Sequence, residues 1–159
     1  MCIRDRWDVG VYPLSFAQYV YSGPPTRVTG SQATGPTGVD LAFVGHMEYP
    51  GGAMAQISAS FISAHHTVVE ICGTEGRLHI ARPFTGMDHA AQLTFYPAVG
   101  TPEETAVPHK ELYMCEVEDM HAAILDGAPS YLSLPETREH VRTTLALYES
   151  ARTGCAVMM

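Results

Sequence analysis

The feature that most constrains this fold is a long stretch, residues 26–99, in which apolar and polar residues alternate between glycines and prolines. The segment GAMAQISASF is typical, because its side chains divide into two faces. One face holds Met54, Gln56, Ser58 and Ser60, and the other holds Ala53, Ala55, Ile57, Ala59 and Phe61. A period of two bounded by glycine or proline predicts strands. YPGG at 49–52 and GTEG at 73–76 predict hairpin turns, so we expect an antiparallel sheet.

Helical patterns flank this stretch on both sides. WDVGVYPLSFAQYV predicts a helix over 8–21, with Asp8 as a possible cap and Pro13 in the first turn. Two more helices are predicted over 112–127 and 133–154, and CAVMM at the end predicts a closing strand. The fold class is therefore α+β, with an open, mainly antiparallel sheet and helices packed on one of its faces.

The bulk properties exclude several classes of protein. The chain has 159 residues, a net charge of −8 and no basic run, which argues against nucleic-acid binding. It lacks the ~18 consecutive apolar residues that a membrane span needs. Four cysteines without Cys-x-x-Cys spacing predict free, mostly buried thiols in a reducing, cytoplasmic setting. We interpret MCIRDR, residues 1–6, as a non-native leader and 7–159 as one domain.

Most chemical motifs are missing from the sequence. It contains no Gly-x-Gly-x-x-Gly, no phosphate loop, no Gly-x-Ser-x-Gly and no His-Glu-x-x-His. His65 and His66 are adjacent, so they would face opposite sides of a strand and could not easily share a metal ion. We therefore predict no metal site. The single lysine, Lys110, falls in a predicted loop with no obvious partner.

Asp8 and Tyr12 remain as candidate catalytic residues. At positions i and i+4 of a helix their side chains would share one face. A carboxylate beside a phenol could hold a substrate hydroxyl and relay its proton. Tyrosine, with an ordinary pKa of roughly 10, needs a nearby positive charge to act as a base. A second interpretation, in which Asp8 caps the helix and Tyr12 packs, stays open beside the catalytic one.

Five segments, taken in order, resemble the C-terminal domain of the Gfo/Idh/MocA family of NAD(P)-dependent oxidoreductases. They are DVGVYPLSFAQYVYSGPPTRV, VDLAFVGHMEYPGGAMAQISASF, VVEICGTEGRLHIARPF, YMCEVEDMHAAILDG and LALYESARTGCAV. Together they cover residues 7–157. The Asp-x-Gly-x-Tyr form at 8–12 is similar to the branch that contains glucose–fructose oxidoreductase, NADP-dependent xylose dehydrogenase and dimeric dihydrodiol dehydrogenase.

The resemblance implies roles for two residues. Tyr12 would be the acid/base on the reacting hydroxyl, and Asp8 would orient the substrate or the proton relay. The third member of the family's set is a lysine in a Glu-Lys-Pro stretch of the Rossmann domain. That domain is absent from this sequence, and Lys110 does not match the stretch. We expect a truncated protein whose full-length form uses NADP or NAD on a sugar, polyol or diol, with no cofactor bound by this chain.

Two other functions stay open. The chain could be a stand-alone, non-catalytic module that dimerises through its open sheet face. In either case we expect a homo-oligomer formed through the face that carries Met54, Gln56, Ser58 and Ser60. An unrelated sheet protein that binds a small ligand ranks last, because it leaves the order of the motifs unexplained.

Overall fold

The computed structural model describes residues 5–84, 91–108 and 110–159. The chain forms two compact units. Unit 1 combines the N-terminal part up to Ser63 with Leu132–Met159, and unit 2 is Ala64–Tyr131. The assignment of 7–159 to a single substrate-binding and oligomerisation domain stays a prediction.

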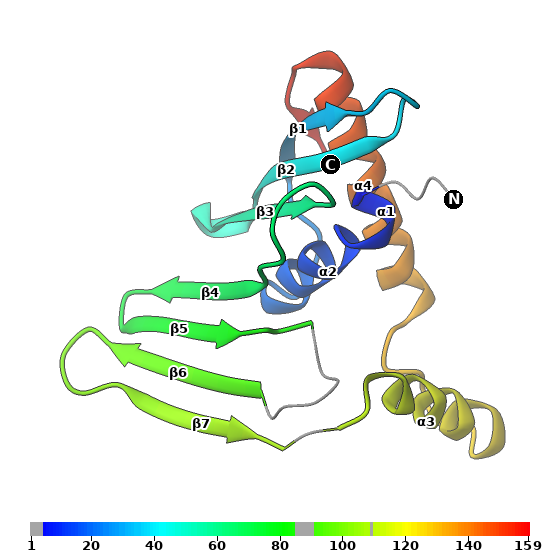
Figure 1. The fold of residues 1–159 in the computed structure, drawn as a ribbon. Coiled ribbons are helices and arrows are strands. Elements are labelled where there is room, and N and C mark those ends of the chain that lie inside the picture. The colour runs from blue at the N-terminus through cyan, green and yellow to red at the C-terminus, as the bar shows by residue number, and fades with distance from the viewer. Residues whose placement is uncertain (1–4, 85–90, 109) are drawn as a thin grey trace. The chain divides into compact units, whose positions relative to one another are not determined.

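Unit 1 contains a four-stranded antiparallel sheet in the order β3-β2-β1-β8 (Figure 1). Its strands are β1 Arg27–Thr34, β2 Asp40–Glu48, β3 Met54–Ser60 and β8 Val157–Met158. A short 3₁₀ turn, Pro50–Gly52, joins β2 to β3, and its glycines have φ angles of 78° and 83°. This left-handed backbone favours glycine, so the hairpin predicted at YPGG is confirmed. β8 confirms the closing strand.

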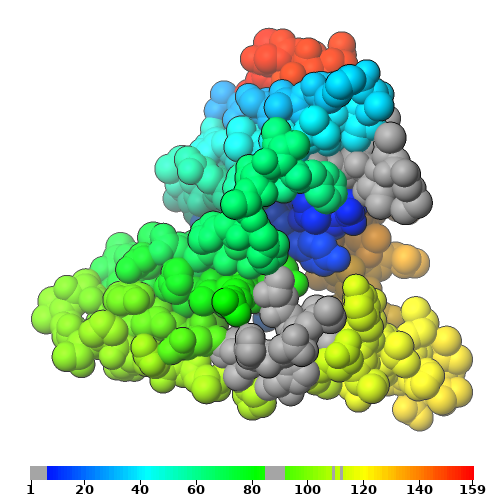
Figure 2. Space-filling model, in the orientation of Figure 1, coloured from blue at the N-terminus to red at the C-terminus, as the bar shows by residue number. Residues whose placement is uncertain are grey.

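Three helices cover one face of this sheet: α1 Asp5–Asp8, α2 Val11–Val20 and α4 Leu134–Thr153. α4 packs along β1, α1 contacts β2 and β3, and α2 contacts β3 and α4. In Figure 2 the blue atoms of the N-terminal helices lie beside the strands. The buried apolar side chains form one core between the helices and the sheet: Leu14, Ala17, Val28, Phe43, Met47, Tyr49, Ile57, Ala146 and Leu147.

Two strand glycines allow α4 to approach the sheet closely. A Cβ atom at Gly30 would lie 2.7 Å from the backbone oxygen of Leu147, and one at Gly45 would lie 3.1 Å from the Leu147 side chain. The Gly30 N–H donates to Ser150 Oγ on α4 at 2.9 Å. The helix therefore replaces a strand neighbour for this part of β1, since β8 pairs only with Arg27 and Val28.

The ends of α4 agree with the sequence. Ser133 accepts a hydrogen bond from the Glu136 N–H, and the Glu136 carboxylate accepts one from the Ser133 N–H. This reciprocal capping box satisfies two backbone donors at the helix start. Gly154 ends the helix with a φ of 70°, a conformation that suits glycine at this position. The predicted cap and stop are both confirmed.

Unit 2 contains a meander of four antiparallel strands followed by a helix (Figure 1). The elements are β4 Val68–Gly73, β5 Gly76–Ala81, β6 Ala91–Pro97, β7 Glu103–Val107 and α3 Leu112–Leu125. The GTEG turn joins β4 to β5 as predicted, whereas β7 was not predicted. The α+β class and antiparallel pairing are confirmed, with the strands divided between two four-stranded sheets.

Candidate active site

The segment that carries Asp8 and Tyr12 forms a corner between two helices. α1 ends at Asp8, Val9 and Gly10 make a turn, and α2 begins at Val11. The predicted continuous helix over 8–21 is therefore wrong at its start. The proposed Asp8 cap is also wrong, because the N-cap of α2 is Gly10 and no side chain makes a capping hydrogen bond there. The buried Gly10 lacks a side chain, which lets the chain turn between two packed helices.

The two candidate residues stand on either side of this turn. Asp8 is half-buried at the end of α1, and Tyr12 is 48 % exposed in the first turn of α2. Pro13 lies in the same first turn, where backbone N–H groups have no partner within the helix, so its missing N–H costs nothing. Both candidate residues therefore lie at this corner, and their joint action on a hydroxyl group stays a prediction.

The opposite side of α2 fixes the corner in place. Leu14 is 1 % exposed and Gln18 is 5 % exposed, and both face the core of unit 1. The Gln18 amide donates to Thr143 Oγ1 on α4 at 2.7 Å, and the Thr143 hydroxyl donates to the Glu139 carbonyl. A buried hydrogen bond of this kind is strengthened by its low-dielectric surroundings, so it ties α2 to α4.

Two tyrosines that sequence reasoning missed hold the far end of α2. Tyr21, which follows the helix, packs against Tyr49 in a tilted arrangement, with ring centroids 4.1 Å apart and 31° between the planes. The Tyr21 hydroxyl donates to the Met54 carbonyl at 3.0 Å. Burial raises the pKa of Tyr49 far above its ordinary value, with a smaller contribution from Tyr21, so its phenol stays protonated and serves packing. The only signal in the sequence is that Tyr49 is the first residue of the YPGG turn.

Comparisons with known proteins indicate the family of this chain. The model of the GFO/IDH/MocA C-terminal domain matches residues 6–79, a span that contains both Asp8 and Tyr12. The chain is 35 % identical over 153 residues to a D-xylose 1-dehydrogenase (NADP(+)) of Haloferax volcanii, covering 94 % of this chain and 46 % of that protein. The chain belongs to the Gfo/Idh/MocA family.

Further relatives widen the comparison. Over 77 residues, 48 % of this chain and 23 % of the relative, the chain is 32 % identical to a trans-1,2-dihydrobenzene-1,2-diol dehydrogenase of Sus scrofa. The fold matches that of an aldose-aldose oxidoreductase from Caulobacter crescentus with a TM-score of 0.86 and 20 % identity. That match covers 98 % of this chain and 47 % of the other. The chain thus spans less than half the length of these relatives.

The one lysine of this Gfo/Idh/MocA chain lies in unit 2. Lys110 Nζ is 2.7 Å from a carboxylate oxygen of Glu118, although the sequence suggested no partner. The hydrogen bond to Glu118 raises the pKa of Lys110, which keeps the ammonium charged. Both side chains are exposed, so this is a surface ion pair of small energetic weight.

The predictions for histidines and cysteines were partly wrong. His65 and His66 lie in an exposed loop before β4, not in a strand. Cys72, Cys115 and Cys155 are free but exposed, so the prediction of mostly buried thiols fails for them, and Cys2 lies outside the described residues. In residues 5–84, 91–108 and 110–159, no group of three or more His, Cys, Asp or Glu side chains could hold a metal ion.

The uncovered face of the unit 1 sheet carries the predicted contact residues. Met54 is 62 % exposed and Gln56 and Ser58 are exposed beside it, while Ile57 faces the core, so the predicted alternation is confirmed over 54–58. It fails beyond this range, because Ser60 is half-buried and Phe61, predicted on the Ile57 face, is 46 % exposed. Arg27 and Glu48 form an ion pair on this face, and His46 Nε2 lies 3.8 Å from the same carboxylate. The face is therefore mixed, with small, polar and charged groups side by side.

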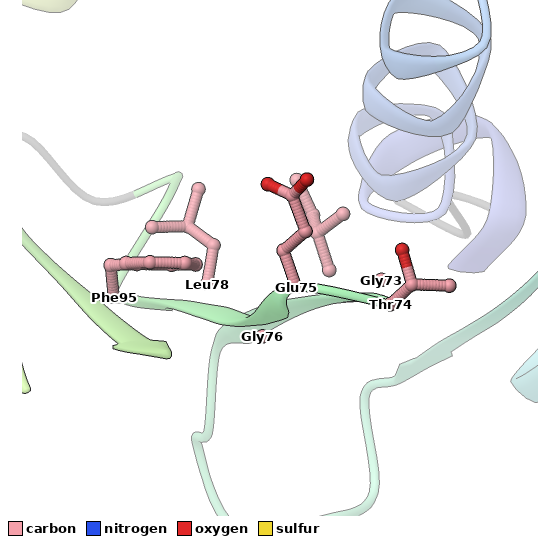
Figure 3. A pocket seen from close by; sticks show the side chains of 7 residues that line it. Gly73, Thr74, Glu75, Gly76, Leu78 and Phe95 are labelled. Carbon is pink, nitrogen blue, oxygen red and sulfur yellow. The ribbon is translucent and has the colours of Figure 1, made fainter. Parts of the chain in front are cut away.

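Unit 2 has one open hollow of about 350 Å³ at the β4–β5 hairpin. In Figure 3 the side chains of Leu78, Phe95 and Glu75 stand on the same side of the strands. Gly73 and Gly76 pair across the hairpin, as expected for turn glycines. The hollow combines apolar walls with a single carboxylate, and that arrangement assigns no chemistry to it.

Among the described residues, none of the helices is both long and apolar enough to cross a bilayer.

Proposed function

We propose that this chain is the substrate-binding half of an NAD(P)-dependent oxidoreductase that oxidises a hydroxyl group of a sugar or diol. The observation that carries the proposal is the α1–α2 corner. It displays the half-exposed Tyr12 and the half-buried Asp8 within the span that matches the family model. The named relatives, a xylose dehydrogenase and a dihydrodiol dehydrogenase, support this class of substrate.

The chemistry of the corner follows from the reaction. Oxidation of a carbinol removes a hydride from carbon and a proton from oxygen. A bound nicotinamide cofactor would supply the acceptor for the hydride. The Tyr12 oxygen, in its ionised form, would take the hydroxyl proton, and the Asp8 carboxylate would accept a hydrogen bond that orients the substrate or the relay. Neither residue supplies a positive charge, so the cation that assists Tyr12 comes from outside this corner, together with the cofactor.

The remaining surfaces have a supporting role in this proposal. The uncovered sheet face of unit 1, around Met54, Gln56 and Ser58, is the contact surface for a second copy. A stand-alone dimerising module is the alternative, but it gives no role to the exposed Tyr12, and the relatives in the comparisons are oxidoreductases. Measurable binding of NADPH to the 159-residue chain would contradict the module, and also our expectation that this chain binds no cofactor, whereas no binding agrees with both proposals.

The decisive experiment uses the gene with its upstream DNA. An open frame that encodes Gly-x-Gly-x-x-Gly and Glu-Lys-Pro would supply the cofactor half, and the full protein can then be assayed with xylose, glucose and dihydrodiols with both cofactors. We expect Tyr12→Phe to lower kcat about 10²- to 10⁴-fold, as for loss of a general acid or base. Tyr19→Phe, on an exposed tyrosine of the same helix, is the control. Near-full activity of Tyr12→Phe would contradict the proposal.

A further inference from the structure

Asp40 is a carboxylate buried where the sequence pattern would expose it. Its side chain is 2 % exposed at the start of β2. A buried carboxylate is costly unless hydrogen bonds stabilise it. The Tyr148 hydroxyl, from α4, donates toward it and lies 3.2 Å from Oδ1 and 3.4 Å from Oδ2. This hydrogen bond links the start of β2 to α4.

A β-bulge creates this placement. Along β2, Phe43, Gly45 and Met47 face the helices, so strict alternation would put Asp40 on the open face with Val44. The register with β1 shifts between Ala33 and Thr34, so that Leu41 is the extra residue and Thr34 opposes Asp40. A slip of one residue turns a side chain to the other face. The bulge therefore turns the Asp40 side chain toward α4. Bulges in other proteins often redirect a side chain in this way.

The Tyr148 ring connects Asp40 to the candidate active site. It stacks against the Trp7 indole, with ring centroids 6.2 Å apart and an angle of 24° between the planes. Trp7 directly precedes Asp8 in α1. Because α1 has only four residues, it cannot hold its own orientation and depends on side-chain contacts with its neighbours. All four of these residues belong to unit 1.

We propose that Asp40 and Tyr148 are positioning residues for the active site. The buried Asp40 carboxylate fixes the Tyr148 phenol, the Tyr148 ring fixes Trp7, and Trp7 sets the direction of the Asp8 carboxylate beside it. The proposal rests on the function proposed above for Asp8. It assigns one common role to the bulge, to the buried Asp40 side chain and to the aromatic stack.

The first test uses the 159-residue chain. Trp7 is its only tryptophan, so fluorescence excited at wavelengths that tyrosine does not absorb reports on α1 alone. Tyr148→Phe keeps the ring and removes the hydroxyl, and Tyr148→Ala removes both. We expect acrylamide quenching of Trp7 to rise in the order wild type, Phe, Ala, with Tyr19→Phe equal to wild type. Circular dichroism selects variants that remain folded. Wild-type quenching in Tyr148→Ala would overturn the proposal.

The second test uses the full-length enzyme and asks whether Tyr148 acts through Asp8. We expect Tyr148→Phe and Asp40→Asn each to lower kcat/KM about 10- to 100-fold, the loss typical of a catalytic group displaced by about 1 Å. Combined with Asp8→Asn, Tyr148→Phe should add little further loss. A merely structural change would instead multiply with Asp8→Asn.

The outcomes separate two kinds of failure. If Asp8→Asn leaves kcat/KM unchanged, the function proposed for Asp8 is wrong, whatever the fluorescence shows. If Asp8→Asn lowers kcat/KM but Tyr148→Phe does not, or the two losses multiply, the proposed function stands and the positioning role is wrong. Only a loss in Tyr148→Phe that disappears in the Asp8→Asn background supports the positioning role.

Discussion

The two units are built from the same kind of strands but differ in how well they are packed. Among the described residues, every buried apolar side chain lies in unit 1, and the one buried residue of unit 2 is Thr94. In unit 1, α1, α2 and α4 form a second layer over the sheet. In unit 2, Ile71, Leu78 and Phe95 line one side of the sheet but remain half-exposed. Alternation makes a two-faced sheet, and only a second layer turns one face into a core.

Because the two units differ in burial, the same leucine-to-alanine truncation should cost more stability in unit 1 than in unit 2. Leu147→Ala in unit 1 should cost about 2–5 kcal/mol of stability, because Leu147 is fully buried between α4 and the sheet. Leu78→Ala in unit 2 should cost about 1 kcal/mol, since a half-exposed leucine loses less transfer free energy. Amide exchange, read by peptide, measures protection in each unit separately. Equal losses for the two variants would break the comparison.

Strand glycines give a second, smaller test. Gly30→Ala places its Cβ 2.7 Å from the Leu147 carbonyl and 2.8 Å from the Phe43 ring, so α4 must move. We expect a loss of about 1–3 kcal/mol. In Gly73→Ala of unit 2 the nearest atom is 3.9 Å away, so stability should stay within about 0.5 kcal/mol of wild type. The midpoints of urea unfolding measure both, and a clear loss in Gly73→Ala would contradict the open packing of unit 2.

Local signals in the sequence predicted most of the elements. The Ser133 cap, the Gly154 stop and the glycine turns are short-range features. They depend only on residues that lie close together in the sequence. The buried side of α4 was harder to predict. Its apolar residues at helical spacing include Val141, Leu145 and Tyr148, which are exposed or half-exposed, whereas the structure buries Thr143, Leu147 and Ser150. Hydroxyl groups in Thr143 and Ser150 find partners on α2 and β1, and no local pattern encodes those partners.

The candidate site shows the same limit. The sequence placed Asp8 and Tyr12 close together along the chain, but it predicted one helix where the structure has a turn at Val9–Gly10. Glycine has a low helix propensity, so Gly10 gives only a weak signal for a break in the helix. The turn at Gly10 also depends on packing against β2 and β3, which no local pattern encodes. The link from Asp40 to Tyr148 spans more than a hundred positions and depends on a bulge, so no periodicity could reveal it.

Surface charges should give the smallest effects, and equal effects in both units. In unit 2 the hydrogen bonds from His79 and Arg77 hold the pKa of Glu70 below its ordinary value of 4.5. In unit 1 the hydrogen bond from Arg152 does the same for Glu149. A lowered carboxyl pKa stabilises the folded state above the ordinary pKa. This contribution is lost as the pH falls below 4.5 and through the folded-state pKa.

Glu70→Gln and Glu149→Gln should therefore each reduce stability slightly at pH 7 and not at all at acidic pH. Both carboxylates are solvent-exposed, so 0.5 M salt should remove most of each difference. Urea midpoints of the wild type and the two variants, compared at several pH values and at low and high salt, measure this. If Glu70→Gln alone is strongly destabilising and resists salt, the Glu70–His79–Arg77 cluster is a structural centre that compensates for the missing core of unit 2. Equally small effects would mean that the units differ in burial and not in surface electrostatics.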